Sequence, residues 1–195
     1  STPTRTYELL VGHKTSAPEL FNQVRIVKLD EWGGLAMDNP ATCEAYLQRH
    51  VLNPLGIDAQ RYVAFHSDPS SPDAECERIQ SLLNESGPID LCILGLGANG
   101  HLGFNEPAEW LMPFPHAAAL TETTLRHPMA QQAETTIGYG LTLGMADILH
   151  SRQILLLVNG DHKQPLLTQL LAGEITTHFP ASLLWLHPNV TILCD

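Results

Sequence analysis

The feature that most constrains this fold is a short apolar run that stops abruptly in glycines. Residues 89–94 (Ile-Asp-Leu-Cys-Ile-Leu) are followed at once by Gly95, Leu96 and Gly97. The run is too short for a typical helix and ends in glycines, which predicts a buried strand of an α/β sheet. Ligands of open α/β sheets bind beyond the carboxyl ends of the strands, so the glycine-rich loop is a candidate site.

The loop carries three kinds of polar group within eight residues. Asn99 offers a carboxamide, His101 an imidazole and Glu106 a carboxylate. Imidazole and carboxylate groups exchange protons near neutral pH, and an amide can orient either of them. This combination favours acid–base chemistry, although a purely structural turn is the simpler alternative for any one of the residues.

Other interpretations of the loop fit less well. Gly95, Gly97 and Gly100 spell the dinucleotide fingerprint, but that motif must open a helix, and Gly103 and Pro107 oppose a long helix here. No Gly-Lys-Ser/Thr follows, so a Walker loop is excluded. His101 and Glu106 lack the spacing of a helical zinc motif, and no second histidine is near in the sequence. We therefore expect neither a metal nor another cofactor.

The rest of the chain alternates short apolar runs with amphipathic stretches. This pattern predicts a three-layer α/β/α sandwich with a mostly parallel, doubly wound, Rossmann-like sheet. The expected strands are 24–29, 62–65, 89–94, 135–143, 153–158, 182–186 and 190–193, and the expected helices lie after Pro3, at 40–52, through 79–83, at 122–132, at 145–149 and from 163 to 171.

Composition restricts the class of partner. The formal net charge is −11 and the hydrophobic fraction is 44%. Nucleic acids and anionic membranes are recognised by basic patches, so neither is an expected partner. No apolar run reaches the length of a membrane span, and no signal peptide opens the chain. The four widely spaced cysteines fit reduced core thiols, and we expect a cytoplasmic protein.

The signature loop, residues 95–107 (GLGANGHLGFNEP), resembles that of the glucosamine-6-phosphate deaminase family, and its wording is closest to the galactosamine-6-phosphate branch. Residues 29–32 (LDEW) and 186–188 (LHP) match in the same order. The resemblance covers essentially the whole chain. It implies conversion of a 2-amino-2-deoxyhexose 6-phosphate into a ketose 6-phosphate with loss of ammonia, without metal or redox cofactor.

The resemblance also implies roles for individual residues. Asp30, at the carboxyl end of an expected strand, matches the carboxylate that removes the C2 proton, and Glu31 is its neighbour in the substrate site. His101 matches the ring-opening residue and Glu106 the group that orients it. Asn99 stands where many glucosamine-6-phosphate deaminases have Asp, which favours galactosamine 6-phosphate. Gly97 belongs to the same substrate loop.

Four residues are expected to bind the phosphate. Ser1 and Thr2 precede Pro3 at a helix start, where hydroxyl groups cap free N–H groups and can hold an anion. Lys163 opens a later helix, an unfavourable place for a cation unless an anion is bound nearby. The resemblance supports Lys163. It places an arginine near Arg126, where Pro128 is the competing alignment.

We expect one domain over residues 1–195, shortened at both ends relative to the family and without its opening strand. A homo-oligomer is one option for its assembly. No allosteric activation by an N-acetylhexosamine phosphate is expected, because the usual Arg and Lys pair is missing after the loop. Two alternatives stay open: a 6-phosphogluconolactonase-type hydrolase, and a sugar-phosphate sensor domain without turnover. Residues 104–107 (FNEP) argue against the first, and the lack of a basic helix-turn-helix argues against the second.

Overall fold

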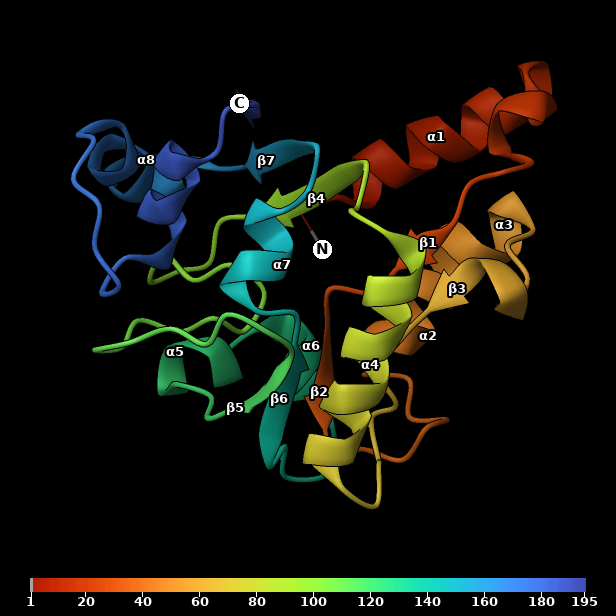
Figure 1. Cartoon of the computed structure of the whole chain (residues 1–195), viewed down its shortest axis with the longest axis horizontal. Coiled ribbons are helices and arrows are strands. Elements are labelled where there is room, and N and C mark those ends of the chain that lie inside the picture. Colours follow the sequence, from red (N-terminus) through yellow and green to blue (C-terminus); the bar gives the residue numbers. More distant parts are fainter. Residues whose placement is uncertain (1) are drawn as a thin grey trace.

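The computed structural model describes residues 2–195 and is built around three small sheets with helices packed on them (Figure 1). A parallel sheet has the order β4-β7-β8, a second parallel pair joins β1 and β3, and an antiparallel sheet has the order β2-β6-β5. The strands are β1 Ile26–Val27, β2 Asp30–Gly33, β3 Tyr62–Val63, β4 Leu91–Gly95, β5 His116–Ala118, β6 Tyr139–Thr142, β7 Gln153–Val158 and β8 Val190–Cys194.

Helices lie between these strands and flank them. The α-helices are α1 Thr4–Ser16, α2 Cys43–Leu47, α3 Asn53–Leu55, α4 Pro72–Ser86, α5 Glu122–Leu125, α6 Pro128–Gln132, α7 Met145–Leu149 and α8 Gln164–Leu171. Shorter helical turns are η1 Pro18–Phe21, η2 Gln48–Leu52, η3 Ala59–Arg61, η4 Asp161–Lys163 and η5 Pro180–Leu186. The predicted α/β class with mostly parallel pairing is confirmed, and the antiparallel β2-β6-β5 sheet is an addition to it.

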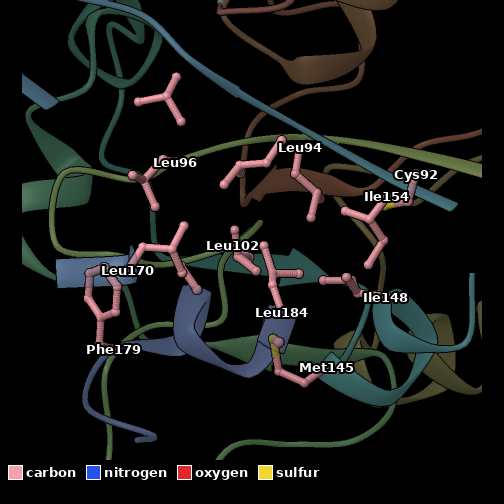
Figure 2. Close-up of a cluster of buried hydrophobic side chains, with 13 residues drawn as sticks. Cys92, Leu94, Leu96, Leu102, Met145, Ile148, Ile154, Leu170, Phe179 and Leu184 are labelled. Carbon is pink, nitrogen blue, oxygen red and sulfur yellow. The ribbon is translucent and has the colours of Figure 1, made fainter. Parts of the chain in front are cut away.

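The parallel sheet β4-β7-β8 carries the main core. Buried side chains of β4 and β7 meet those of α7, α8 and η5, among them Leu94, Ile154 and Leu156. Figure 2 shows Leu102, which belongs to the glycine-rich loop, lying among Leu94 and Leu184 within this cluster. The loop is thus anchored in the core by a fully buried leucine, while its polar residues remain at the end of β4.

Two local predictions were wrong. Residues 182–186 were expected to form a strand, but they lie in the 3₁₀ helix η5, where Pro180 occupies the first turn and Ala181, Ser182 and Leu184 are buried. A run of apolar residues of this length cannot by itself distinguish a strand from a buried helical turn. At the start of the chain Pro3 is the N-cap of α1, not its first helical residue, and no side-chain hydroxyl caps that helix.

Helices that bound the site begin and end as their sequences indicate. Thr42 caps α2 by accepting a hydrogen bond from the backbone N–H of Ala45, and the helical segment ends at Gly56, whose φ of +63° is left-handed. No helix within residues 2–195 combines the length and apolar character required to cross a bilayer.

Truncation of a core leucine in the central strand should destabilise the protein strongly. Leu156 in β7 has 0% exposure, so Leu156→Ala should lower the free energy of unfolding by about 2–5 kcal/mol through lost transfer energy and a cavity. Leu171, 59% exposed in α8, is the matched control, and Leu171→Ala should cost less than about 0.5 kcal/mol. Urea unfolding measures both, and equal losses would contradict this assignment of the core.

Candidate active site

The glycine-rich loop leaves β4 and returns on itself with a tight hydrogen-bonded turn. The backbone N–H of Gly97 donates to the carbonyl of His101 (3.0 Å), and that of Gly100 donates to the carbonyl of Gly97 (3.1 Å). Gly100 has a φ of +86°, and a Cβ built there would meet the Phe179 ring at 2.2 Å. The turn therefore requires glycine at this position for both conformation and space.

The ring of His101 lies directly against the backbone of Gly97. A Cβ on Gly97 would fall 2.3 Å from the imidazole, so this glycine makes room for the ring. The close packing of the imidazole explains why position 97 requires a glycine. Thr2, at the start of the chain, lies near the beginning of the same loop, since a Cβ on Gly95 would be 3.6 Å from its hydroxyl oxygen. Ser1 lies outside the described residues.

Asn99 connects the imidazole to the carboxylate. Its Oδ1 is 2.7 Å from His101 Nδ1, and its Nδ2 donates to Glu106 Oε2 at 2.8 Å. Because the amide group faces Glu106, Oδ1 must be the acceptor, and Nδ1 of His101 carries the proton. His101 Nε2 then carries the free lone pair, and no hydrogen-bond partner for Nε2 is found within residues 2–195.

Glu106 is held as an anion by its neighbours. Burial opposes ionisation, but hydrogen bonds from His101, Thr124 and Asn99 lower the pKa of Glu106 to about 2. Its Oε2 lies 3.5 Å from His101 Nδ1, and its side chain is only 9% exposed. A fixed negative charge at this distance stabilises positive charge on the imidazole ring.

Two threonines support this pair, and the sequence analysis did not single them out. Thr124 Oγ1 donates to Glu106 Oε1 and lies 3.3 Å from His101 Nδ1, while Thr121 Oγ1 lies 3.3 Å from both oxygens of Glu106. Thr121 is also the N-cap of α5, accepting the N–H of Thr124. The signal available in the sequence was the capping pattern of residues 121–124 (TETT), which gives no indication of which carboxylate it would meet.

Asp30 lies beside the same loop, although it is about seventy residues distant in the chain. It starts β2 opposite Thr142 of β6, and a Cβ on Gly103 would be 2.7 Å from Thr142 Oγ1 and 3.6 Å from Asp30 Oδ2. Gly103 has a φ of +59° and thus lets the loop approach the carboxylate closely. The structure brings Asp30 and the loop of His101 to one place.

The environment of Asp30 suits a base that works near neutral pH. Burial, and then the charge of Glu31, raise the pKa of Asp30 to about 6, while His101, the Cys43 thiol and Lys28 pull it partly back. The thiol of Cys43 donates to Asp30 Oδ1 over 3.7 Å. Neither Cys43 nor Lys28 was a candidate in the sequence analysis, since nothing in their spacing links them to Asp30.

Glu31 was expected at the substrate, but the structure places it elsewhere. Its side chain has 0% exposure. Oε1 accepts the backbone N–H groups of Trp32 and Cys43, each at 2.8 Å, and Oε2 accepts Lys28 Nζ at 2.7 Å and the N–H of Glu44 at 2.9 Å. A carboxylate with four donors and no exposed surface cannot contact a ligand. Glu31 has a structural role next to Asp30 in β2.

Arg126 is also corrected. Its side chain is 77% exposed and pairs with Glu122 at 3.3 Å across one turn at the end of α5. Exposed pairs of this kind contribute little and hold no fixed geometry. The described structure gives Arg126 no contact with the other candidate residues, so it leaves the candidate site.

Lys163 is the N-cap residue of α8, the helix that follows β7, as the sequence analysis predicted. Burial lowers the pKa of its ammonium group, and no salt bridge to it forms within the described residues. The charge of Lys163 also acts on His127. Burial lowers the pKa of His127, and the positive charges of His101 and Lys163 lower it further. A positive charge that acts on these groups would also attract an anion bound between them.

Comparison with known proteins identifies the family of the chain. Residues 1–193 match the family described as glucosamine-6-phosphate isomerases/6-phosphogluconolactonase. The chain is 42% identical over 195 residues to putative deaminase AgaI of Escherichia coli (strain K12), covering 100% of this chain and 77% of that protein. It is 35% identical over 198 residues to glucosamine-6-phosphate deaminase of Geobacillus sp. (strain WCH70), covering 100% of this chain and 78% of that protein.

Solved structures show the same fold. A monomeric glucosamine-6-phosphate deaminase superposes with a TM-score of 0.94 at 33% identity, covering 100% of this chain and 82% of that chain. A 6-phosphogluconolactonase from Leishmania guyanensis gives 0.76 at 17% identity, covering 100% and 80%, which shows a shared fold alone. The chain belongs to the glucosamine-6-phosphate isomerase/6-phosphogluconolactonase family.

Proposed function

We propose that this protein is an amino-sugar-phosphate deaminase/isomerase that converts a 2-amino-2-deoxyhexose 6-phosphate and water into a ketose 6-phosphate and ammonia. The observation that carries the proposal is the juxtaposition of two different acid–base groups, Asp30 and the bridged pair His101–Glu106, at one strand-end loop. The names of the most similar proteins, deaminases at 42% and 35% identity, support the same reaction class.

The imidazole suits the opening of the sugar ring. With the proton of Nδ1 donated to Asn99, His101 Nε2 can take the proton of the O1 hydroxyl and return it to the ring oxygen as the C1–O5 bond breaks. The imidazole ring carries a positive charge between these two transfers, and Glu106 at 3.5 Å from Nδ1 stabilises that charge. The product of this step is the open-chain aldehyde.

Asp30 suits the isomerisation that follows. The aldehyde at C1 makes the C2 proton acidic, so Asp30 as a carboxylate can remove it. The proton is then delivered to C1. The nitrogen becomes an iminium group at C2, water adds to that carbon, and ammonia leaves as the C2 carbonyl of the ketose forms. A partly desolvated carboxylate with a pKa of about 6 is a stronger base than an exposed one and is still ionised at pH 7.

The phosphate of the substrate is assigned to Lys163, with Thr2 beside the loop as a second contact. An ammonium group at the start of α8, without an acidic partner among the described side chains, is suited to a dianion. A cytoplasmic location belongs to the proposal, and the free state of all four cysteines is consistent with it.

Galactosamine 6-phosphate is the proposed preferred sugar. The preference rests on the likeness of the signature loop to the galactosamine branch and on Asn99, which keeps the hydrogen-bonding shape of an aspartate without its charge. The two amino sugars differ only in configuration at C4, so the product from galactosamine 6-phosphate would be tagatose 6-phosphate.

Ammonia release from galactosamine 6-phosphate and glucosamine 6-phosphate tests the reaction. We expect turnover of both, with the higher kcat/KM for the galactosamine sugar, and a loss of about 10²–10⁴-fold in kcat for Asp30→Asn without loss of sugar-phosphate binding. Binding of both sugars with no ammonia from the parent protein would favour a sensor. Hydrolysis of 6-phosphogluconolactone in place of deamination would favour a lactonase.

The activity should fall at low pH as Asp30 becomes protonated. We expect kcat/KM to decline below about pH 6, where the pKa of Asp30 lies. The second ionisation of a phosphate monoester lies near the same pH, so the affinity of glucitol 6-phosphate, which has no amino group or acidic C2 proton, is measured in parallel. If kcat/KM declines no more than the affinity for glucitol 6-phosphate does, the assignment of the decline to Asp30 is contradicted.

Asp30→Asn should stabilise the fold at neutral pH. The pKa of Asp30 is raised from 3.8 to about 6 on folding, so the native state binds more protons between these values and stability is lost as pH rises through them. The variant removes that cost. Its advantage in urea unfolding should grow by about 1–3 kcal/mol between pH 4 and pH 7.5. A difference independent of pH would show that Asp30 has an ordinary pKa.

A further inference from the structure

A buried lysine lies two residues before the proposed base in the chain, and the reaction as described above does not use it. Lys28 is 2% exposed, and its Nζ donates to Glu31 Oε2 at 2.7 Å and to Glu44 Oε2 at 2.9 Å. Glu44 is held in turn by the Tyr62 hydroxyl at 2.7 Å and by Gln48 Nε2 at 2.9 Å. We call Lys28, Glu31, Glu44 and Tyr62 the lysine cluster.

The lysine cluster is linked to the base by the backbone. Glu31 follows Asp30 in β2, and its carboxylate fastens the first N–H groups of α2, those of Cys43 and Glu44, at 2.8 and 2.9 Å. This connection fixes the thiol of Cys43 against Asp30 Oδ1. Lys28 completes the coordination of Glu31, so loss of the ammonium group would leave a fully buried carboxylate without a counter-charge.

The charges in this region are unbalanced. Lys28 is paired with two acids, Glu31 and Glu44, and the charge of Glu31 opposes the ionisation of Asp30 while that of Lys28 favours it. A buried ion pair is weak evidence for a contribution to stability, because desolvation can exceed the attraction. Lys28 has a clearer effect on Asp30, the one acid here that must change its protonation state, because its positive charge favours the ionised form.

We propose that Lys28 is a positioning residue for Asp30: through Glu31 it holds the start of α2 against the base, and its charge keeps the Asp30 carboxylate ionised at the pH of the reaction. The proposal rests on the proposed function for its catalytic consequence, but its electrostatic part concerns Asp30 alone. The charged and titratable groups that act on Asp30 from the elements around it are Glu31, His101, Cys43, Lys28 and the Tyr7 phenol of α1.

The test compares two variants with opposite expected signs. Lys28→Met removes the positive charge at nearly constant side-chain length, so the midpoint of Asp30 ionisation should rise by on the order of one pH unit. Glu44→Gln removes one of the two carboxylates that neutralise Lys28 and retains its hydrogen-bonding shape, so more of the Lys28 charge acts on Asp30 and the midpoint should fall. Tyr62→Phe deletes a hydrogen bond in the same cluster without a change in charge and should leave the midpoint in place.

The midpoint is measured by the ¹³C chemical shift of the Asp30 side-chain carboxyl in each full-length variant, assigned by its loss in Asp30→Asn. The acid limb of ammonia release should follow the same order. The NMR titration needs no substrate, so failure of the proposed function would not obscure it. Should Lys28→Met fail to fold, Glu44→Gln decides the sign. Equal midpoints in the parent and the variants, or a rise in Glu44→Gln, would overturn the proposal.

Discussion

The close approach of Gly103 to Asp30 and Thr142 is the contact on which the candidate site depends. It joins the loop after β4, which belongs to the parallel sheet β4-β7-β8, to the start of β2 and the end of β6, which pair in the antiparallel sheet. Thr142, with 0% exposure, accepts the N–H of Phe104 and donates to the carbonyl of Leu143, so the loop is attached to β6 by its backbone. Without a glycine at 103 the imidazole and the carboxylate would be held apart.

Three acids in this region have three different environments. Glu31 is fully buried and accepts hydrogen bonds from four donors, which fix its side chain in place. Glu106 accepts hydrogen bonds from His101, Thr124 and Asn99, which lower its pKa and keep it ionised. Burial and the charge of Glu31 raise the pKa of Asp30 to about 6, and within residues 2–195 its side chain has only the weak thiol donor of Cys43. Of Glu106 and Asp30, the carboxylate with fewer donors is therefore the one that can exchange a proton near neutral pH.

This arrangement implies a conflict between stability and activity at one residue. An acid whose pKa is raised by folding destabilises the native state wherever it is ionised, and Asp30 must be ionised to act as a base. The lysine cluster reduces that conflict without removing it, because Lys28 is shared by two other carboxylates. The core under the loop, with Leu102 and Leu156 fully buried, supplies the rigidity that such a site requires.

The sequence by itself determined the fold class, the strand before the glycine-rich loop, the start of the helix after Lys163 and the membership of Asn99, His101 and Glu106 in one loop. These features depend on local patterns: hydrophobic period, glycine positions and motif spacing. Tertiary structure alone decided that Glu31 is buried and Arg126 exposed, that Thr121 and Thr124 support Glu106, and that Lys28 pairs with Glu31 and Glu44. The physical reason is that burial and charge pairing depend on neighbours distant in the chain, which spacing does not encode.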